Sequence, residues 1–554
     1  MSEHKRPALT AGQETRVPVV VVGAGPVGLA MGNELGWRGI GALLIERATS
    51  VPDFPTCEAI NARTMEHMRR WGFVDGIRGA GFPRDIPRTV RFMTRALGHE
   101  LLCFERPSNE GFRAELSAVT PESGVWCPRM MFEPVMRRHL DRYPHVGVEA
   151  GWQVTGFTQD ADGVRIDAEH VESGQQARVL ADYLVACDGA GSTTRKALDI
   201  PMEGTFAEGH NVTVYFRSTE LRDLLASRPG VMMDIVNADG RANLSWVDGN
   251  DDWRLMNYVQ PDEPLDPDRH IQAALGRKVA YELIGAKPWT GHRVVAERFR
   301  DRRVFLAGDA AHLLWPRGGF GMNTGIGDAV DLGWKLEAAL KGWAGDALLD
   351  SYETERRPVA VRNVNEAASN RAEDAGLPVP AHIEADTAEG EAARQRLGAI
   401  IREKRAKEWN SMGIQLGYVY DESPLVAAEG PSAGPASTTD YEPSTVPGSR
   451  APHVWLEPGR SILDLFGEGF VLLSFGTTHN GAALLTAAQT QGLPMREVHI
   501  DNVDAQRLYG RRHVLVRPDG HVAWRGDAMP EDADALIARV RGVALPATVA
   551  ASLG

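Results

Sequence analysis

The sequence predicts an α/β protein that opens with a doubly wound parallel sheet, and two observations carry this prediction. Val19 to Val22 form an apolar, β-branched run that stops at Gly23, and the helical pattern Val27 to Trp37 follows after a short turn. A second apolar run, Ile40 to Ile45, ends at Glu46. Strand, turn, helix and strand in this order form a βαβ unit, in which the two strands lie parallel.

Further along the chain the pattern changes twice. Short alternating runs from Val148 to Val185 indicate an antiparallel ribbon that leads back to the first sheet. Residues 205–295 contain strand-like runs between polar turns, which predicts a second, mixed-sheet domain inserted into the first. Val304 to Ala307 form another apolar strand, and a helical pattern from Gly325 to Ala339 follows it. The first domain therefore resumes near residue 295.

The C-terminal third is divided by composition. Arg362 to Lys407 are rich in Ala, Glu and Arg, which predicts helices, and Gly430 to Arg450 form a linker rich in Pro, Ser, Thr and Gly. After the linker we expect strands at Gly469 to Ser474 and His513 to Arg517, and a final helix at Glu531 to Val543. This tail is expected to form a small α/β domain.

Composition excludes several classes of function. The chain has 554 residues with 43% hydrophobic and 24% charged residues, so it is expected to fold into two to four globular domains. A net charge of −14 opposes binding to nucleic acids and to anionic lipid surfaces. No apolar stretch reaches the length of a membrane-spanning helix, and the start of the chain lacks a signal peptide. We therefore expect a cytoplasmic protein without membrane or nucleic-acid partners.

The four cysteines provide no evidence for a metal site. They are widely separated, form no Cys-x-x-Cys pair and lie near no histidine cluster of metal-ligand spacing, so we expect reduced thiols and no bound metal; they are Cys57, Cys103, Cys127 and Cys187.

A glycine triplet lies at the turn of the βαβ unit. Gly23, Gly25 and Gly28 give the pattern G-x-G-x-x-G directly after a strand, and Glu46 ends the next strand. The first two glycines permit a tight turn and close approach of a diphosphate to the helix N-terminus, while Glu46 can accept a hydrogen bond from a ribose hydroxyl. The pattern predicts a bound dinucleotide but does not by itself distinguish FAD from NAD.

Two later segments decide between these cofactors. Leu184 to Arg195 and Phe305 to His312 are apolar strands that end in an aspartate beside a glycine, and Pro316 to Gly325 and Leu349 to Pro358 continue the pattern. In this order the segments resemble the motifs of the class A flavin monooxygenases, the family of para-hydroxybenzoate hydroxylase and phenol hydroxylase. The resemblance implies a Rossmann-like FAD-binding domain and no separate domain for NADH or NADPH.

The same resemblance implies which residues face the cofactor. Asp309 is expected to bind a ribityl hydroxyl, and the helix that starts near Asn323 is expected to point its positive end at the flavin. Catalytic roles are expected for Pro316, Gly319 and Asn323. The full set of expected FAD-binding residues is Gly23, Gly25, Pro26, Gly28, Glu46, Arg47, Arg63, Arg129, Asp188, Gly189, Gly308, Asp309, Pro316, Gly319, Gly321, Met322 and Asn323.

Two positions depart from the family pattern. Thr56 stands where many relatives carry an arginine or lysine near the cofactor phosphates, and Arg129 stands where many have glutamine. We expect Arg129 to donate to the ribityl chain, although a surface arginine at a helix N-terminus remains an alternative. For His312, next to Asp309, we predict a role in ordering the loop by hydrogen bonds and no role as a base.

The resemblance extends to the tail and sets the expected domain boundaries. Residues 449–545 resemble the thioredoxin-like domain of the phenol hydroxylase branch, and no cysteine follows Cys187, so dithiol chemistry is excluded. Packing or subunit association is the expected role. The predicted boundaries are 15–205 with 295–365 for the FAD-binding domain, 206–294 for the substrate-binding domain, 366–448 for a helical region and linker, and 449–545 for the thioredoxin-like domain.

The function implied is a monooxygenase that consumes NADPH or NADH and dioxygen and hydroxylates a phenolic or hydroxylated heteroaromatic ring through a flavin hydroperoxide. Baeyer–Villiger oxidation, epoxidation and oxidative decarboxylation in a natural-product pathway remain alternatives, as does a non-catalytic flavoprotein that senses redox state or binds a partner. A homo-oligomer is expected. Residues that could line the substrate pocket are His210, Tyr215, Asp234, Trp246 and Tyr258.

Overall fold

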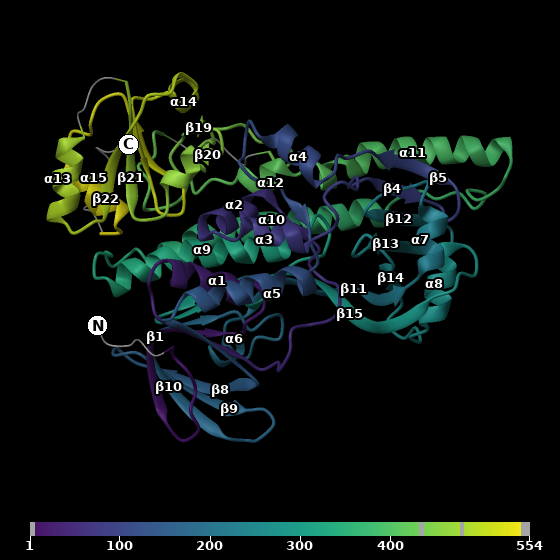
Figure 1. Cartoon of the computed structure of the whole chain (residues 1–554), viewed down its shortest axis with the longest axis horizontal. Helices are drawn as coiled ribbons and strands as arrows, with labels where there is room; N and C mark the ends of the chain where they lie inside the picture. Colours follow the sequence, from purple (N-terminus) through teal and green to yellow (C-terminus); the bar gives the residue numbers. More distant parts are fainter. Residues whose placement is uncertain (1–5, 431–436, 477–480, 544–554) are drawn as a thin grey trace.

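The computed structural model describes residues 6–430, 437–476 and 481–543. The start of the chain (1–5), part of the predicted linker (431–436) and parts of the predicted tail (477–480 and 544–545) lie outside the described residues. Figure 1 shows a layer of helices between the first large sheet and the C-terminal α/β unit at the upper left, with the second large sheet at the right. The predicted α/β class is confirmed.

The first sheet holds the βαβ unit. Its strand order is β16-β17-β10-β1-β2-β7, and β8 and β9 extend β10 as an antiparallel ribbon. Helix α1 (Pro26–Trp37) packs on α9 (Gly321–Leu340) and α5 (Arg129–His139). The strands are β1 (Glu14–Val22), β2 (Ala42–Glu46), β7 (Val146–Ala150), β8 (Trp152–Gln159), β9 (Val164–His170), β10 (Gln176–Ala186), β16 (Arg300–Asp301) and β17 (Val304–Leu306).

The second sheet has the order β18-β15-β11-β14-β13-β12-β4-β5. Its middle strands come from the segment predicted as an insertion, but β4 and β5 come from residues before it and pair with β12 at the far edge. The strands are β4 (Val90–Met93), β5 (Glu100–Phe104), β11 (Met202–Arg217), β12 (Met232–Asn237), β13 (Gly240–Trp246), β14 (Asp252–Val259), β15 (Glu282–Ala296) and β18 (His312–Leu313). The second structural unit therefore takes part of the range predicted for the FAD-binding domain.

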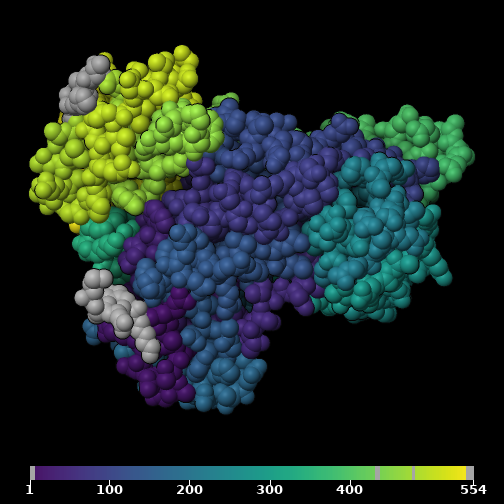
Figure 2. All heavy atoms as spheres, viewed as in Figure 1, coloured from purple at the N-terminus to yellow at the C-terminus, as the bar shows by residue number. Residues whose placement is uncertain are grey.

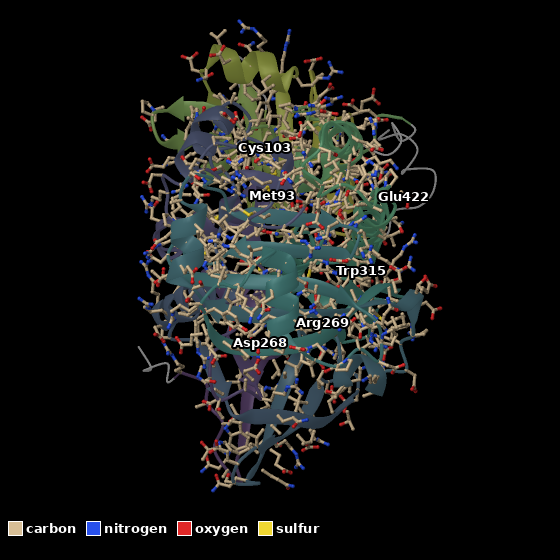
Figure 3. The ribbon with its side chains drawn as sticks, turned by 90° about the vertical axis from the view of Figure 1, so that its right-hand side faces the viewer. Met93, Cys103, Asp268, Arg269, Trp315 and Glu422 are labelled. Atoms are coloured by element: carbon tan, nitrogen blue, oxygen red, sulfur yellow. The ribbon has the colours of Figure 1, made fainter. Side chains whose placement is uncertain are left out.

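Helices α7 (Thr219–Leu225) and α8 (Pro267–Leu275) pack on one face of the second sheet, which we call its outer face. Their apolar residues form a buried cluster with Val214, Leu244 and Leu255 of the sheet. Figure 3 views the molecule from this side and shows Asp268 and Arg269 of α8 toward the viewer. The remaining helices before the tail are α2 (Ala62–Trp71), α3 (Val74–Ala80), α4 (Asn109–Leu116), α6 (Thr193–Ala197), α10 (Ser351–Ala375), α11 (Ala388–Trp409) and α12 (Met412–Leu416), and β3 (Ala59–Ile60) pairs with β6 (Val125–Trp126).

The C-terminal unit is a four-stranded mixed sheet of order β22-β21-β23-β24. In the space-filling view it packs directly against the body of the molecule (Figure 2). Its elements are β19 (Trp455–Glu457), β20 (Arg460–Ser461), β21 (Phe470–Phe475), α13 (Ala482–Thr490), β22 (Met495–Ile500), α14 (Val503–Tyr509), β23 (His513–Val516), β24 (Val522–Gly526) and α15 (Ala533–Val540). Among the described residues, none of the helices is long and apolar enough to cross a bilayer.

Candidate active site

The glycine turn lies at the carboxyl ends of the first sheet's parallel strands. A Cβ added at Gly23 would collide with the Cys187 carbonyl, and one added at Gly28 would overlap the Gly23 carbonyl oxygen. Gly23 also has φ +97°, which favours glycine. At Gly308 an added Cβ would lie 2.8 Å from a Val27 methyl group. The three segments predicted to hold the dinucleotide thus meet at one edge of the sheet, as expected for open α/β sheets.

Two carboxylates flank this turn. Glu46 accepts hydrogen bonds from the backbone N–H groups of Ala24 at 2.7 Å and Ala48 at 2.9 Å. Asp188 accepts from the Thr194 N–H at 3.1 Å through Oδ2, whereas its buried Oδ1 has no hydrogen-bond partner. An unsatisfied buried carboxylate oxygen is costly, so a donor from a bound ligand would stabilise Asp188.

A third carboxylate, Asp309, lies close enough to Cys57 and Arg129 for their charges to interact. Its side chain is exposed to solvent, yet the surrounding protein raises the pKa of Asp309, while the charges of His312 and Arg129 oppose the rise. Burial and the nearby Asp309 charge raise the pKa of Cys57 to about 11, so this thiol is protonated at neutral pH.

Gly319 and Asn323 connect the loop before α9 to the residues around β3. The Asn323 side chain donates to the carbonyls of Ala59 at 2.9 Å and Gly319 at 2.7 Å, and its oxygen accepts from the Asn61 N–H. Gly319 has φ +68°, and a Cβ there would lie 2.9 Å from the Ala59 Cβ. Pro316 is exposed at the start of the same loop. The Asn323 side chain thus holds this loop against the residues around β3. Helix α9 begins at Gly321, and no side chain caps its N-terminus.

Asp328 of α9 organises the loop that follows β17. The carboxylate accepts from the Gly308 N–H at 3.0 Å, from His312 Nε2 at 2.8 Å and from Arg356 Nε at 2.8 Å. Burial alone would raise the pKa of Asp328, but His312 and Arg356 hold it below its ordinary value. His312 is fully buried and lies in this network, which supports the predicted ordering role.

One face of the second sheet is polar although it is buried. Strand registers put alternate residues of β11, β12, β13 and β14 on this face, and most are shielded from solvent. Polar groups inside a protein are retained where they are hydrogen-bonded or meet a ligand. The face includes three predicted pocket residues, and its members are Asn211, Thr213, Tyr215, Asp234, Asn243, Ser245, Arg254, Met256 and Tyr258.

Segments of the cofactor region contact this polar face at two places. Glu58, next to β3, accepts from Arg254 Nε at 2.7 Å. Arg317, between Pro316 and the loop glycines, donates to Tyr258 Oη at 2.7 Å and to Asp234 Oδ1 at 3.3 Å. Burial raises the pKa of Asp234, against the opposing charges of Arg317 and Arg405. Two of the predicted substrate residues, Asp234 and Tyr258, are therefore joined in one polar network to the loop Pro316–Phe320 before α9, which we call the flavin loop.

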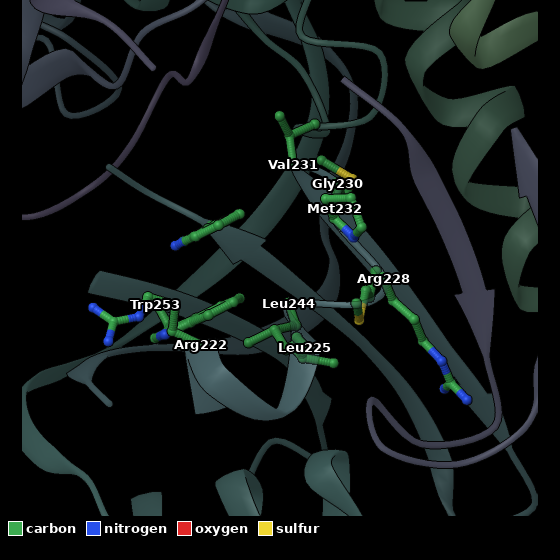
Figure 4. Close-up of a pocket in the computed structure, with 11 residues that line it drawn as sticks. Arg222, Leu225, Arg228, Gly230, Val231, Met232, Leu244 and Trp253 are labelled. Carbon is green, nitrogen blue, oxygen red and sulfur yellow. The ribbon is translucent and has the colours of Figure 1, made fainter. Parts of the chain in front are cut away.

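Three predicted site residues are not brought into this group. Trp246 is on the outer face, where it stacks on Trp253 at 5.5 Å and lines a small cavity of about 10 Å³ (Figure 4). His210 contacts Thr290 at 3.5 Å at the β11–β15 pairing. Arg63 donates to Glu66 and to the Asp519 carbonyl of the C-terminal unit, at 2.9 and 2.7 Å. Their assignment as site residues stays a prediction.

Sequence reasoning did not assign site roles to several residues of the network. Arg317 and Arg356 lie within the motif segments and Asp328 lies three residues beyond one of them, so their position was a usable signal. Glu58 and Arg254 carried no such signal, because their pairing joins residues almost 200 positions apart in the chain and depends on the tertiary fold.

The residues present fit an FAD molecule. The glycine turn leaves no room for side chains at Gly23 and Gly28, the N-terminus of α1 has no side-chain cap, and Asp188 has an unsatisfied oxygen. Arg129 and Asp309, whose charges interact, add one cation and one carboxylate. Together these groups offer donors for a diphosphate and acceptors for ribose and ribityl hydroxyls.

Two protein-family models match the chain. The family model "FAD binding domain" matches residues 16–367, and the model "Aromatic-ring hydroxylase, C-terminal" matches residues 444–544.

Three similar proteins illustrate the relationship. The FAD-dependent monooxygenase apdD of Emericella nidulans is 32% identical, over 95% of this chain and 90% of that protein. A putative polyketide hydroxylase of Streptomyces halstedii is 34% identical over 92% and 93% of the two chains. A structure of RebC soaked with chromopyrrolic acid, with bound 7-carboxy-K252c, is 38% identical with a TM-score of 0.90, covering 96% and 99%. The chain belongs to the FAD-dependent monooxygenases of the aromatic-ring hydroxylase family.

Proposed function

We propose that this enzyme uses a reduced nicotinamide and dioxygen to hydroxylate a ring of a multi-ring aromatic natural-product intermediate. The observation that carries the proposal is the contact between the flavin loop and the buried polar face of the second sheet. Arg317 joins the two through Tyr258 and Asp234, so a substrate held by this face would lie beside the flavin.

The chemistry is divided between cofactor and protein. FAD, when bound, takes electrons from the nicotinamide and delivers one atom of dioxygen to the substrate. The polar face supplies hydrogen-bonding groups, such as Asn243 and Ser245, that can orient hydroxyl or carbonyl groups on the ring. The Asn211 side-chain oxygen is buried without a partner among the described residues, which leaves one acceptor available for a substrate hydroxyl.

Two relatives support a natural-product substrate. The Streptomyces halstedii relative is named as a polyketide hydroxylase, and another structure of RebC at 38% identity describes it as a rebeccamycin biosynthetic enzyme. A cytoplasmic location is part of the proposal, because the four cysteines are unpaired, as in a reducing compartment.

Product analysis tests the proposal. The FAD-loaded enzyme would be incubated with NADH or NADPH and a panel of single-ring phenols and multi-ring phenols, with nicotinamide consumption and product masses recorded. We expect multi-ring phenols to stimulate nicotinamide oxidation and to gain about 16 mass units, the mass of one oxygen atom, through the flavin chemistry. Stimulation by single-ring phenols alone would contradict the substrate class.

A further inference from the structure

Arg371, near the C-terminal end of α10, lies between two aromatic rings. Its guanidinium carbon is 4.1 Å from the centre of the Tyr258 ring and 5.2 Å from that of Trp315. Tyr258 belongs to the polar face of the second sheet, and Trp315, labelled in Figure 3, directly precedes Pro316 of the flavin loop. The guanidinium therefore lies where the proposed substrate face meets the flavin loop.

The side chain of Arg371 lacks the acceptors that an arginine requires. Its Nε is buried without a hydrogen-bond partner, and within the described part of the chain the guanidinium forms no hydrogen bond or ion pair. Aromatic rings attract the positive charge but offer no oxygen lone pair to the five N–H donors of a guanidinium. Because unsatisfied donors are costly inside a protein, a bound acceptor would stabilise this side chain.

The charges around Arg371 do not balance. Three further arginines and three carboxylates lie beside it and act on one another; they are Arg241, Arg317, Arg405, Asp234, Asp374 and Glu408. With Arg371 the cluster holds four cations against at most three anions. Burial also raises the pKa of Asp234, which favours its uncharged form. The cluster therefore carries at least one surplus positive charge.

The pairing within this cluster leaves Arg371 as the open cation. Arg317 and Arg405 both donate to the Asp374 carboxylate. Arg241 donates to three backbone carbonyl groups at 3.0 to 3.2 Å. Each of these arginines thus has acceptors in the protein, whereas Arg371 has none among the described residues. A buried cation of this kind is matched by an anion that binds from outside.

The aromatic side chains next to Arg371 suit a flat ring system. Trp289 packs edge-on against Trp315 with ring centres 6.1 Å apart and donates to Thr213 of the polar face at 2.9 Å. A Cβ at Gly291 would lie 2.4 Å from the Trp315 ring, so glycine at this position leaves room for the ring. Aromatic rings pack favourably against one another. A flat substrate on the polar face would contact these rings and present the groups at its edge to Arg371.

We propose that Arg371 binds a carboxylate carried by the aromatic substrate and so selects acids among multi-ring phenols. This inference rests on the proposed function and narrows its substrate class. A planar guanidinium can donate two parallel hydrogen bonds to a carboxylate, which fixes the direction of the bound group as well as adding affinity. In this role Arg371 orients the ring on the polar face and takes no part in oxygen transfer.

Equilibrium binding of matched probes to the FAD-loaded enzyme tests the proposal. The probes are hydroxylated naphthalene and anthracene carboxylic acids, each paired with its carboxamide, which has a similar shape but no charge. A change in flavin absorbance reports binding. We expect the wild type to bind each acid about 10-fold or more tightly than its amide, the effect of one hydrogen bond to a charged group.

Variants assign this preference to the guanidinium. Arg371→Gln should raise the Kd for the acids about 10- to 100-fold and change the Kd for the amides by less than about twofold. Arg371→Lys keeps the charge but not the paired donors, so it should retain part of the preference. Arg402→Gln removes an exposed arginine of α11 that makes a similar contact with the Phe104 ring of β5, and it should bind both probes like the wild type. Thermal unfolding and FAD content verify that each variant is folded.

Equal affinity for acid and amide in the wild type, or binding of neither, would overturn the proposal. Equal weakening of acids and amides in Arg371→Gln would also overturn it, in favour of a packing role between the two rings. Product analysis separates this inference from the proposed function. Oxygenation of neutral multi-ring phenols without any preference for acids would refute the carboxylate site alone. Acid-selective binding through Arg371 without oxygenation of any multi-ring phenol would support the carboxylate site and refute the proposed function.

Discussion

Arg517 of the C-terminal unit donates hydrogen bonds to both carboxylate oxygens of Glu355 in α10, at 2.6 and 2.8 Å, and both side chains are fully buried. Lys335 of α9 donates to the same Glu355 at 2.6 Å and to Asp331 at 2.7 Å. Asp331, Glu355 and Asp519 lie close enough to hold a metal ion, but two cations already lie among them. The cluster joins the tail to the helix that begins at the flavin loop.

Arg517→Met should therefore destabilise the whole protein. Removing one partner leaves Glu355 and Asp519 buried with less compensation, which typically costs about 3–5 kcal/mol in the free energy of unfolding. Urea unfolding measured by circular dichroism checks this value. Arg507→Met, at an exposed arginine of α14, should change the free energy by less than about 0.5 kcal/mol. A similar small change in Arg517→Met would mean that the cluster does not hold the tail in place.

Asp331 and Glu355 should respond differently to neutral substitutions. Burial and the nearby Glu355 raise the pKa of Asp331 well above its ordinary value, against Lys335 and Arg517. For Glu355 burial is outweighed by Arg517 and Lys335, which hold its pKa well below the ordinary range. Asp331→Asn, which resembles the protonated acid, should cost less than about 1 kcal/mol, whereas Glu355→Gln should cost about 3 kcal/mol or more because it removes the paired charge. Equal losses would contradict the opposite pKa directions of Asp331 and Glu355.

The pH dependence of stability gives a second test of the raised Asp331 pKa. A raised pKa in the folded state stabilises the protein below the ordinary aspartate pKa, and this contribution is lost as the pH rises through the raised value. Thermal unfolding from pH 4 upward should therefore show a loss of stability in the wild type that is reduced in Asp331→Asn.

Asp328→Asn should weaken the cofactor site. The substitution removes the charge that pairs with Arg356 and changes an acceptor of the Gly308 N–H, so we expect the Kd for FAD to rise about tenfold or more, the effect of one charged hydrogen bond. The lowered pKa of Asp328 stabilises the fold above the ordinary aspartate pKa, and the contribution is lost as the pH falls below it. The acid limb of the stability profile should be flatter in the variant. Asp346→Asn, at an exposed site, is the control.

Substitutions of Tyr258 and Trp246 should have different effects, because the two residues lie on opposite faces of the second sheet. Tyr258→Phe removes the acceptor of Arg317 beside the flavin loop, so we expect the KM for the aromatic substrate to rise about 5- to 20-fold, near the value of one hydrogen bond to a charged group. Trp246→Phe, on the outer face, should change thermal stability with KM within about twofold. A larger KM effect from Trp246 would place the substrate elsewhere.

The local pattern of the chain was enough to predict the first sheet. The βαβ unit was readable because a β-branched run, a glycine turn and a helical period follow one another without interruption. Pairing of β4 with β12 was not predictable in the same way, since it joins residues that are far apart in the chain and depends on which edge of the second sheet is open. The predicted range 206–294 contains β12, β13 and β14, whereas β4 and β5 of the same sheet lie before it in the chain.

For the site, motif positions were more informative than residue types. Glycines and aspartates of the dinucleotide segments converge as expected, because strand ends of a parallel sheet meet at one edge. Arg63 matched a motif as well, yet its guanidinium bonds to Glu66 and to the C-terminal unit. Which way a long side chain points depends on neighbours that only the fold supplies. The predicted pocket residues of the second sheet are also divided. Tyr215 lies on its polar face and His210 and Trp246 lie on the other, since a strand places alternate residues on opposite faces.

Incorporation of labelled oxygen tests the central claim most directly. The FAD-loaded enzyme would be supplied with NADPH or NADH, a multi-ring phenol that stimulates nicotinamide oxidation, and ¹⁸O₂ in ordinary water, and the product mass would be measured. A monooxygenase should place one ¹⁸O atom in the product for each nicotinamide consumed in coupled turnover. A hydroxylated product whose oxygen comes from water, or nicotinamide oxidation without an oxygenated product across the panel, would contradict the assignment of aromatic hydroxylation to this site.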